Sequence, residues 1–115
     1  MNSHESCHKI NLVEALELLQ GPQGERSVAL FEHGSLLVKL YAPRGSDPQT
    51  PHSRDEIYVV ARGSGEFVCG ARQAFVTNDV LFAAAGVEHR FENFTDDFAV
   101  WVFFYGPEGG EVNQR

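Results

Sequence analysis

The 115-residue chain has few cysteines, few basic residues and no long apolar run. Its two cysteines, Cys7 and Cys69, are too few for a disulfide scaffold. Sixteen acidic residues outnumber nine basic ones and give a net charge of −7, which argues against nucleic acid or an anionic membrane as partner. No segment approaches the roughly 20 apolar residues that span a bilayer, and the polar N-terminus does not resemble a signal peptide. These absences predict a small soluble protein of the cytoplasm.

The composition is that of one globular domain. Hydrophobic residues make up 43% of the chain and charged residues 22%, and 115 residues are enough for a single core but not for two. We expect residues 11–106 to form this domain. Residues 1–10 and 107–115 are expected to be flexible tails.

The spacing of apolar residues predicts one helix followed by about eight strands. Residues 12–19 place Leu12, Leu16 and Leu19 on one helical face, and Asn11 with Glu14 forms a capping-box pattern. From residue 27 onward, short runs of β-forming residues alternate with turn residues. The predicted strands are 28–31, 36–41, 56–61, 66–69, 74–76, 80–83, 89–94 and 98–105. This order is typical of an all-β protein, a small antiparallel sandwich or barrel with one N-terminal helix.

The last predicted strand is apolar on both faces. Phe98, Val100, Val102 and Phe104 alternate with Ala99, Trp101, Phe103 and Tyr105. Either the N-terminal helix covers the outer face within one subunit, or a second subunit covers it. The small size of the domain favours the second arrangement and so predicts a homodimer.

Three residues are candidate metal ligands. His52 and His89 lie beside turns at the edges of predicted strands, and Glu56 begins a strand four residues after His52. Two imidazoles and one carboxylate form a site with open coordination positions, which suits non-haem Fe(II); the same donors also bind Zn²⁺, Mn²⁺ and Ni²⁺. A histidine and a glutamate four residues apart also fit an exposed ion pair.

Two segments around these residues resemble the paired motifs of the cupin family. Residues 51–65 are similar to the second half of the first motif, because six residues separate Glu56 from Gly63. Residues 78–93 are similar to the second motif, with Gly86, His89 and Asn93 in register. The resemblance extends over about residues 36–106. It implies a conserved β-barrel of the double-stranded β-helix (jelly-roll) type that binds a divalent transition metal, with Fe, Mn, Ni and Zn not distinguished.

The first motif departs from the family pattern at one position. Cupins typically offer three histidines and one glutamate, and the first histidine position falls on Thr50. The resemblance therefore implies His52, Glu56 and His89 as ligands. Thr50 is left to hold a water or to act as a weak oxygen ligand, and Gln49 is a further candidate if the proline-rich segment kinks.

Two polar residues are candidates for contact with a substrate. Arg54 shares a face with His52 if this segment is extended, and a guanidinium there suits a carboxylate or enolate. It also suits an ion pair with Asp55 or Glu56. Tyr58 lies on the same strand face as Glu56, whereas Asp55 lies on the opposite face and is a weaker rival ligand.

Three aromatic residues, Phe67, Phe82 and Phe91, are expected to line the barrel, either as core or as a platform for a ligand. The resemblance implies a metal-dependent dioxygenase or isomerase acting on a small organic molecule. The alternatives are a small-molecule binding or sensing module without catalysis, and a stand-alone interaction or storage protein. Thr50 in place of a histidine fits an enzyme, because a missing imidazole leaves room for substrate. It also fits a binding or sensing module, because a missing imidazole weakens the metal site.

Overall fold

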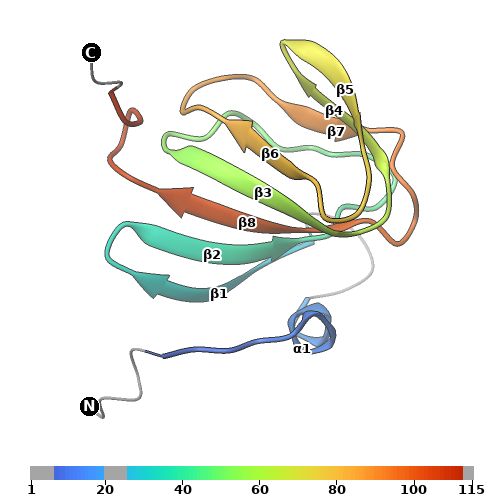
Figure 1. Ribbon diagram of the computed structural model, residues 1–115, viewed down its shortest axis with the longest axis horizontal. Coiled ribbons are helices and arrows are strands. Elements are labelled where there is room, and N and C mark those ends of the chain that lie inside the picture. Colours follow the sequence, from blue (N-terminus) through green and yellow to red (C-terminus); the bar gives the residue numbers. More distant parts are fainter. Residues whose placement is uncertain (1–6, 20–25, 113–115) are drawn as a thin grey trace.

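Eight antiparallel strands form two facing sheets in the computed structural model, which describes residues 7–19 and 26–112 (Figure 1). The larger sheet has the order β1 (Ser27–His33), β2 (Leu36–Tyr41), β8 (Ala99–Tyr105), β3 (Asp55–Arg62) and β6 (Val80–Ala83). The smaller sheet has the order β5 (Ala71–Phe75), β4 (Gly65–Cys69) and β7 (Arg90–Glu92). Because β8 lies between β2 and β3, strands distant in sequence are neighbours in the barrel. The predicted all-β antiparallel barrel is confirmed.

The strand boundaries follow the sequence prediction except where turns decide them. Strand β5 is predicted at 74–76 but spans Ala71–Phe75, because its pairing with β4 begins at the turn around Gly70, where φ is 69°. Residues 71–74 are exposed and show no apolar alternation, so the pattern could not reveal them. Strand β7 is shorter than the predicted 89–94, and Asn93, with a φ of 53°, follows its last residue.

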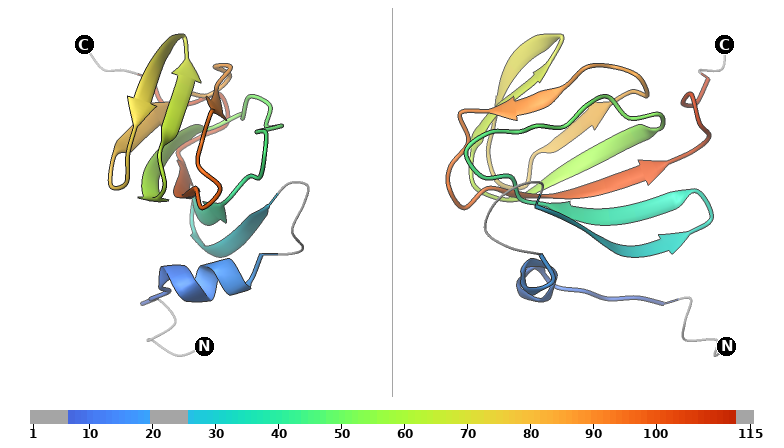
Figure 2. Two further views of the ribbon diagram at one scale, coloured as in Figure 1. Left: turned by 90° about the vertical axis from the view of Figure 1, so that its right-hand side faces the viewer. Right: turned by 180° about the vertical axis from the view of Figure 1, so that it is seen from behind.

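One helix, α1 (Leu12–Glu17), packs on the outside of the larger sheet (Figure 2). Its predicted capping box is present, with Glu14 N donating to Asn11 Oδ1 at 2.8 Å and Asn11 N donating to Glu14 Oε1 at 3.2 Å. It ends two residues before the predicted Leu19, with Leu18 as its C-cap. No helix among the described residues has the length and apolar character needed to cross a bilayer.

The helix covers part of the outer face of β8. Ala15 of α1 is completely buried in a cluster with Leu40 and Ala99, and Trp101 packs against this cluster. The sequence left open whether the helix or a second subunit covers the outer face of this strand. At Ala99 and Trp101 the helix of the same subunit covers it. Phe103, further along the same face, is half-buried.

The interior between the sheets is mainly aromatic. Phe91 is central to it, with ring centroids 5.0 Å from Tyr58, 5.3 Å from Phe67 and 4.9 Å from Phe98. Phe67 and Phe91 are thus buried in the barrel, but Phe82 is 51% exposed. The expectation for Phe82 is wrong because the register pairs it with the outward-facing Ile57.

Residues at both ends of the described chain contact the barrel. The His8 ring stacks on Phe31 with centroids 5.0 Å apart. Near the other end, Glu111 N donates to Asp55 Oδ2 at 2.8 Å. Parts of both predicted tails therefore lie against the domain.

Candidate metal centre

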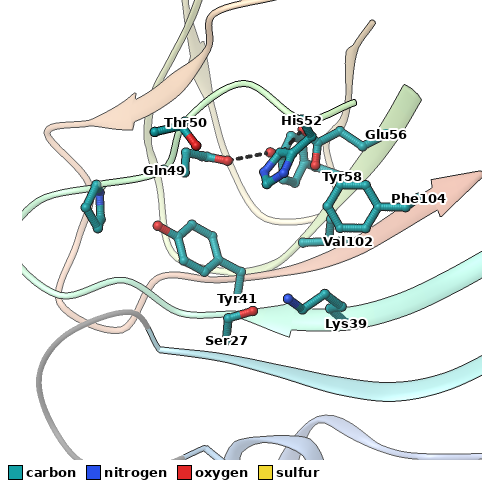
Figure 3. Close-up of a pocket in the computed structure, with 11 residues that line it drawn as sticks. Ser27, Lys39, Tyr41, Gln49, Thr50, His52, Glu56, Tyr58, Val102 and Phe104 are labelled. Carbon is teal, nitrogen blue, oxygen red and sulfur yellow. Dashed lines mark hydrogen bonds and ion pairs between the residues drawn. The ribbon is translucent and has the colours of Figure 1, made fainter. Parts of the chain in front are cut away.

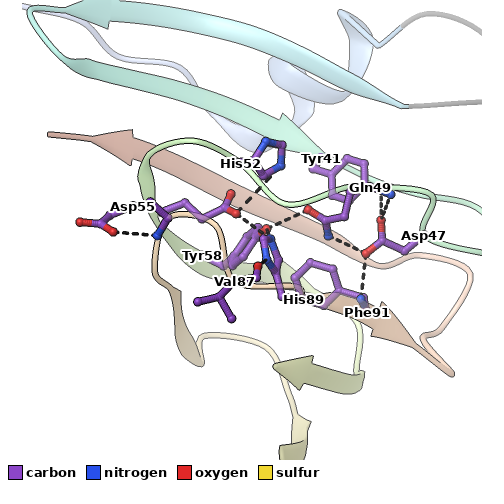
Figure 4. Close-up of polar contacts among 11 residues, drawn as sticks. Tyr41, Asp47, Gln49, His52, Asp55, Tyr58, Val87, His89 and Phe91 are labelled. Carbon is purple, nitrogen blue, oxygen red and sulfur yellow. Dashed lines mark hydrogen bonds and ion pairs between the residues drawn. The ribbon is translucent and has the colours of Figure 1, made fainter. Parts of the chain in front are cut away.

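His52 and His89 lie close together at one end of the barrel (Figure 4), and Glu56 lies with them. Glu56 is the second residue of β3 and points inward, His52 lies in the loop before β3, and His89 directly precedes β7. One potential ligand atom from each side chain lies within 4.8 Å of the others. Glu56 Oε1 is 2.6 Å from His89 Nε2 and 4.0 Å from His52 Nε2. The structure thus brings together the three residues that the sequence singled out.

Backbone contacts join the loop that carries His52 to the turn that precedes His89. Gly86 N donates to the His52 carbonyl at 2.7 Å, and Gly86 has a φ of 78°, which favours glycine. Asp55 is buried beside this turn, and its Oδ1 accepts a hydrogen bond from Ala85 N at 2.9 Å. Asp55 therefore holds the turn from the opposite strand face and does not join the cluster.

The His89 ring is oriented for metal binding. Its Nδ1 is 2.8 Å from the Val87 carbonyl, so Nδ1–H donates there and Nε2 is directed into the site. Burial lowers the pKa of His89, but the contact with Glu56, the Val87 carbonyl and nearby negative charge together raise it above its usual value. The proximity of Glu56 therefore favours the protonated form of His89.

Glu56 has the environment of a ligand that requires a cation. Its side chain is 1% exposed, and neither carboxylate oxygen accepts a hydrogen bond from the residues described. Oε1 lies 2.6 Å from His89 Nε2 and 4.0 Å from His52 Nε2, so both imidazoles face this carboxylate. A buried carboxylate without donors is costly unless a positive charge lies against it. Two imidazoles and this carboxylate fit a divalent transition metal, which His52, Glu56 and His89 would hold.

Tyr58 and Gln49 line the same site. The Tyr58 hydroxyl donates to Gln49 Oε1 at 3.1 Å and lies 3.0 Å from His89 Nε2. Burial, followed by the charge of Glu56, raises the pKa of Tyr58, so its hydroxyl keeps its proton. Thr50 is exposed at the edge of the cavity.

The sequence did not identify Asp47, which holds Gln49 in place. Asp47 Oδ1 accepts from Gln49 N at 3.2 Å and from the Tyr41 hydroxyl. Its Oδ2 accepts from Gln49 Nε2 at 2.6 Å and from Phe91 N at 2.8 Å. An aspartate two residues before Gln49, with Pro48 between them, is an Asx-turn signal. Its contacts with Tyr41 and Phe91 appear only in the folded chain.

A cavity of about 240 Å³ opens beside the cluster (Figure 3). His52 and Glu56 line one side, and Tyr41 and Lys39 line the other. The structure directs Arg54 elsewhere. Its guanidinium donates to the Ser35 carbonyl and lies 6.0 Å from the centroid of the Phe104 ring.

The fold and the site define a class of protein: antiparallel double-sheet barrels that carry a His-Glu-His cluster at one end. The family model described as a cupin domain matches residues 37–105, and the chain belongs to the cupin family. A curated relative, the uncharacterized protein SCO3923 of Streptomyces coelicolor, is 36% identical over 77 residues. This match covers 64% of this chain and 73% of that protein.

Solved structures show the same fold. A Cupin 2 conserved barrel domain protein from Salinispora arenicola CNS-205 matches with a TM-score of 0.67 and 21% identity, over 87% of this chain and 90% of that chain. The DMSP lyase DddQ from Ruegeria pomeroyi DSS-3 matches with a TM-score of 0.63 and 20% identity, over 79% of this chain and 53% of that chain. These similarities place the chain among proteins with a cupin barrel.

Proposed function

We propose that this protein is a divalent-metal-dependent enzyme, of the dioxygenase or isomerase type, that acts on a small organic molecule. The observation that carries the proposal is the buried Glu56 carboxylate, which accepts no hydrogen bond from the residues described and faces His52 and His89. When bound there, a divalent iron, manganese, nickel or zinc ion supplies Lewis-acid chemistry or, for a redox metal, the chemistry of an oxygenase.

The surrounding residues support a reaction site. Tyr58 and Gln49 lie beside the cluster, and a lone pair of the Tyr58 hydroxyl and the second N–H of the Gln49 amide offer hydrogen bonds to a molecule in the cavity. Thr50, in place of a third histidine, leaves space for such a molecule. A cavity of about 240 Å³ limits it to a small compound. The neighbour DMSP lyase DddQ is an enzyme on a similar barrel, which supports catalysis on this fold without indicating the reaction.

One observation favours a second function, a metal-free small-molecule binding or sensing module. The 2.6 Å contact between Glu56 Oε1 and His89 Nε2 provides a positive charge for the carboxylate when His89 is protonated. In this case no metal is needed to compensate Glu56, and the cavity serves for binding alone.

Metal content distinguishes the two functions. Untagged protein is analysed by elemental mass spectrometry before and after incubation with Fe(II), Mn(II), Ni(II) or Zn(II). We expect near-stoichiometric metal in the wild type and in the control His33→Ala, whose histidine is exposed at the end of β1. The double variant His52→Ala/His89→Ala is expected to lose it. Folded wild-type protein that binds none of these metals would refute the enzyme proposal and leave the binding module.

A homodimer remains a prediction from the apolar faces of β8. Multi-angle light scattering of the untagged protein measures the mass directly, and a single species of 12.8 kDa would contradict it.

A further inference from the structure

Lys39 places a positive charge on the inward face of β2. It pairs with Val102 of β8, and alternate residues of a strand point to the same side, so Lys39 shares a face with the core residue Tyr41. Figure 3 shows its ammonium end directed into the cavity, across from His52 and Glu56.

No group among the described residues pairs with the Lys39 ammonium. Within residues 7–19 and 26–112, Lys39 forms neither an ion pair nor a side-chain hydrogen bond. The nearby Asp47 carboxylate is already engaged, since its two oxygens accept bonds from Tyr41, Gln49 and Phe91. An apolar side chain would pack at least as well at this strand position, so packing does not explain a lysine there.

The cavity becomes positive once a metal is bound. Glu56 and the nearby Asp47 contribute two negative charges, which a divalent cation offsets, and Lys39 then leaves one net positive charge around the cavity. A positive cavity attracts anions, although the protein as a whole has a net charge of −7. The expectation that Arg54 would provide this charge fails, because its guanidinium contacts Ser35 and Phe104.

We propose that Lys39 binds the carboxylate of a small monoanionic substrate whose reacting end faces His52, Glu56 and His89. This inference rests on the proposed metal-dependent function. A single ammonium suits one carboxylate, whereas a phosphate dianion is typically held by several donors. With about 240 Å³ available, the substrate is a compact organic acid.

The test compares carboxylates with their uncharged amides. Zn(II)-loaded protein is titrated with lactate, pyruvate and benzoate, each beside the matching amide, and ligand-observed NMR gives the dissociation constants. We expect at least one carboxylate to bind about tenfold more tightly than its amide, the effect of one charge-assisted hydrogen bond. Lys39→Met, which keeps the length of the apolar stem, should abolish this preference, and Lys39→Arg should retain most of it.

The control is Lys9→Met, because Lys9 is exposed and does not line the cavity, and it should behave as the wild type. Zinc content is measured for every variant, so a protein without zinc refutes the metal-dependent function separately from the role of Lys39. Two outcomes with zinc bound would overturn the proposal. In the first, the wild type binds no carboxylate, or binds none more tightly than the matching amide. In the second, the preference for a carboxylate over its amide persists in Lys39→Met.

Discussion

The backbone N–H of Gly86 donates to the carbonyl of His52 at 2.7 Å. This bond joins the loop that carries one candidate ligand to the turn that positions another, His89. A main-chain hydrogen bond between residues 34 positions apart thus connects the two motifs next to the metal cluster. The geometry of the site therefore depends on a turn that itself supplies no ligand.

Gly86→Ala should weaken both the fold and the site. No atom lies within 4 Å of the position of a new Cβ, so the cost comes from the positive φ of 78° and amounts to about 1–2 kcal/mol of unfolding free energy. Urea denaturation measures this loss, and zinc affinity should fall by about tenfold. Gly34→Ala, which has a φ of 59° and equally open surroundings, is the matched control. It should lose similar stability but keep its zinc affinity; an equal loss of affinity would contradict the role of the turn.

Asp55→Ala should destabilise the protein by about 2 kcal/mol, because two part-buried hydrogen bonds, from Ala85 N and Glu111 N, lose their acceptor. Chemical denaturation checks this value. Asp96→Ala removes a carboxylate that is exposed in a turn and should change stability by less than about 0.5 kcal/mol. If the two variants were equally stable, the proposed anchoring by Asp55 would be wrong.

Asp47→Ala should cost about 2–3 kcal/mol, since four hydrogen bonds converge on this carboxylate. Gln49 would also lose its anchor, so the affinity for a cavity ligand should fall together with thermal stability. Gln49→Ala separates these effects: we expect weaker ligand binding with a smaller loss of melting temperature. A Gln49→Ala variant less stable than Asp47→Ala would reverse this assignment.

Stability should decrease as the pH falls through the range where Glu66 and Glu92 titrate. Hydrogen bonds from Asn93 and then Arg72 lower the pKa of Glu66, and contacts with Arg90 and then Arg72 lower that of Glu92. Groups whose pKa is lower in the folded state stabilise it above their unfolded pKa of about 4.3, and this contribution is lost on acidification.

The variant Arg72→Ala tests the direction of this effect. Its urea midpoint should fall less steeply between about pH 5 and pH 3 than that of the wild type, because the lowered pKa values depend on this guanidinium. An identical pH dependence in the two proteins would show that the ion pairs contribute nothing to stability. Exposed pairs of this kind contribute little each, so parallel measurements at one ionic strength are required.

Local pattern was sufficient for the strands, and long-range pairing decided the exceptions. Strands β2 and β6 have the predicted bounds because apolar runs and flanking turn residues specify them. The pattern missed most of β5, whose exposed residues pair with β4 through a hairpin. Phe82 was placed on the wrong face for a related reason, since a shift of one residue in register exchanges the two faces of a strand.

The sequence by itself determined the fold class, the capping of α1 and the identity of His52, Glu56 and His89 as candidate ligands. The fold class and the helix cap follow from periodicity and turn chemistry, and the candidate ligands follow from the resemblance to the cupin motifs. The tertiary structure alone decided which cation faces the cavity. Residues 50–54 lie in a loop, so alternation does not apply to Arg54, whereas Lys39 is on a regular strand opposite the cluster. The position of a side chain across a barrel depends on strand order and register, which are set by contacts between residues far apart in the chain.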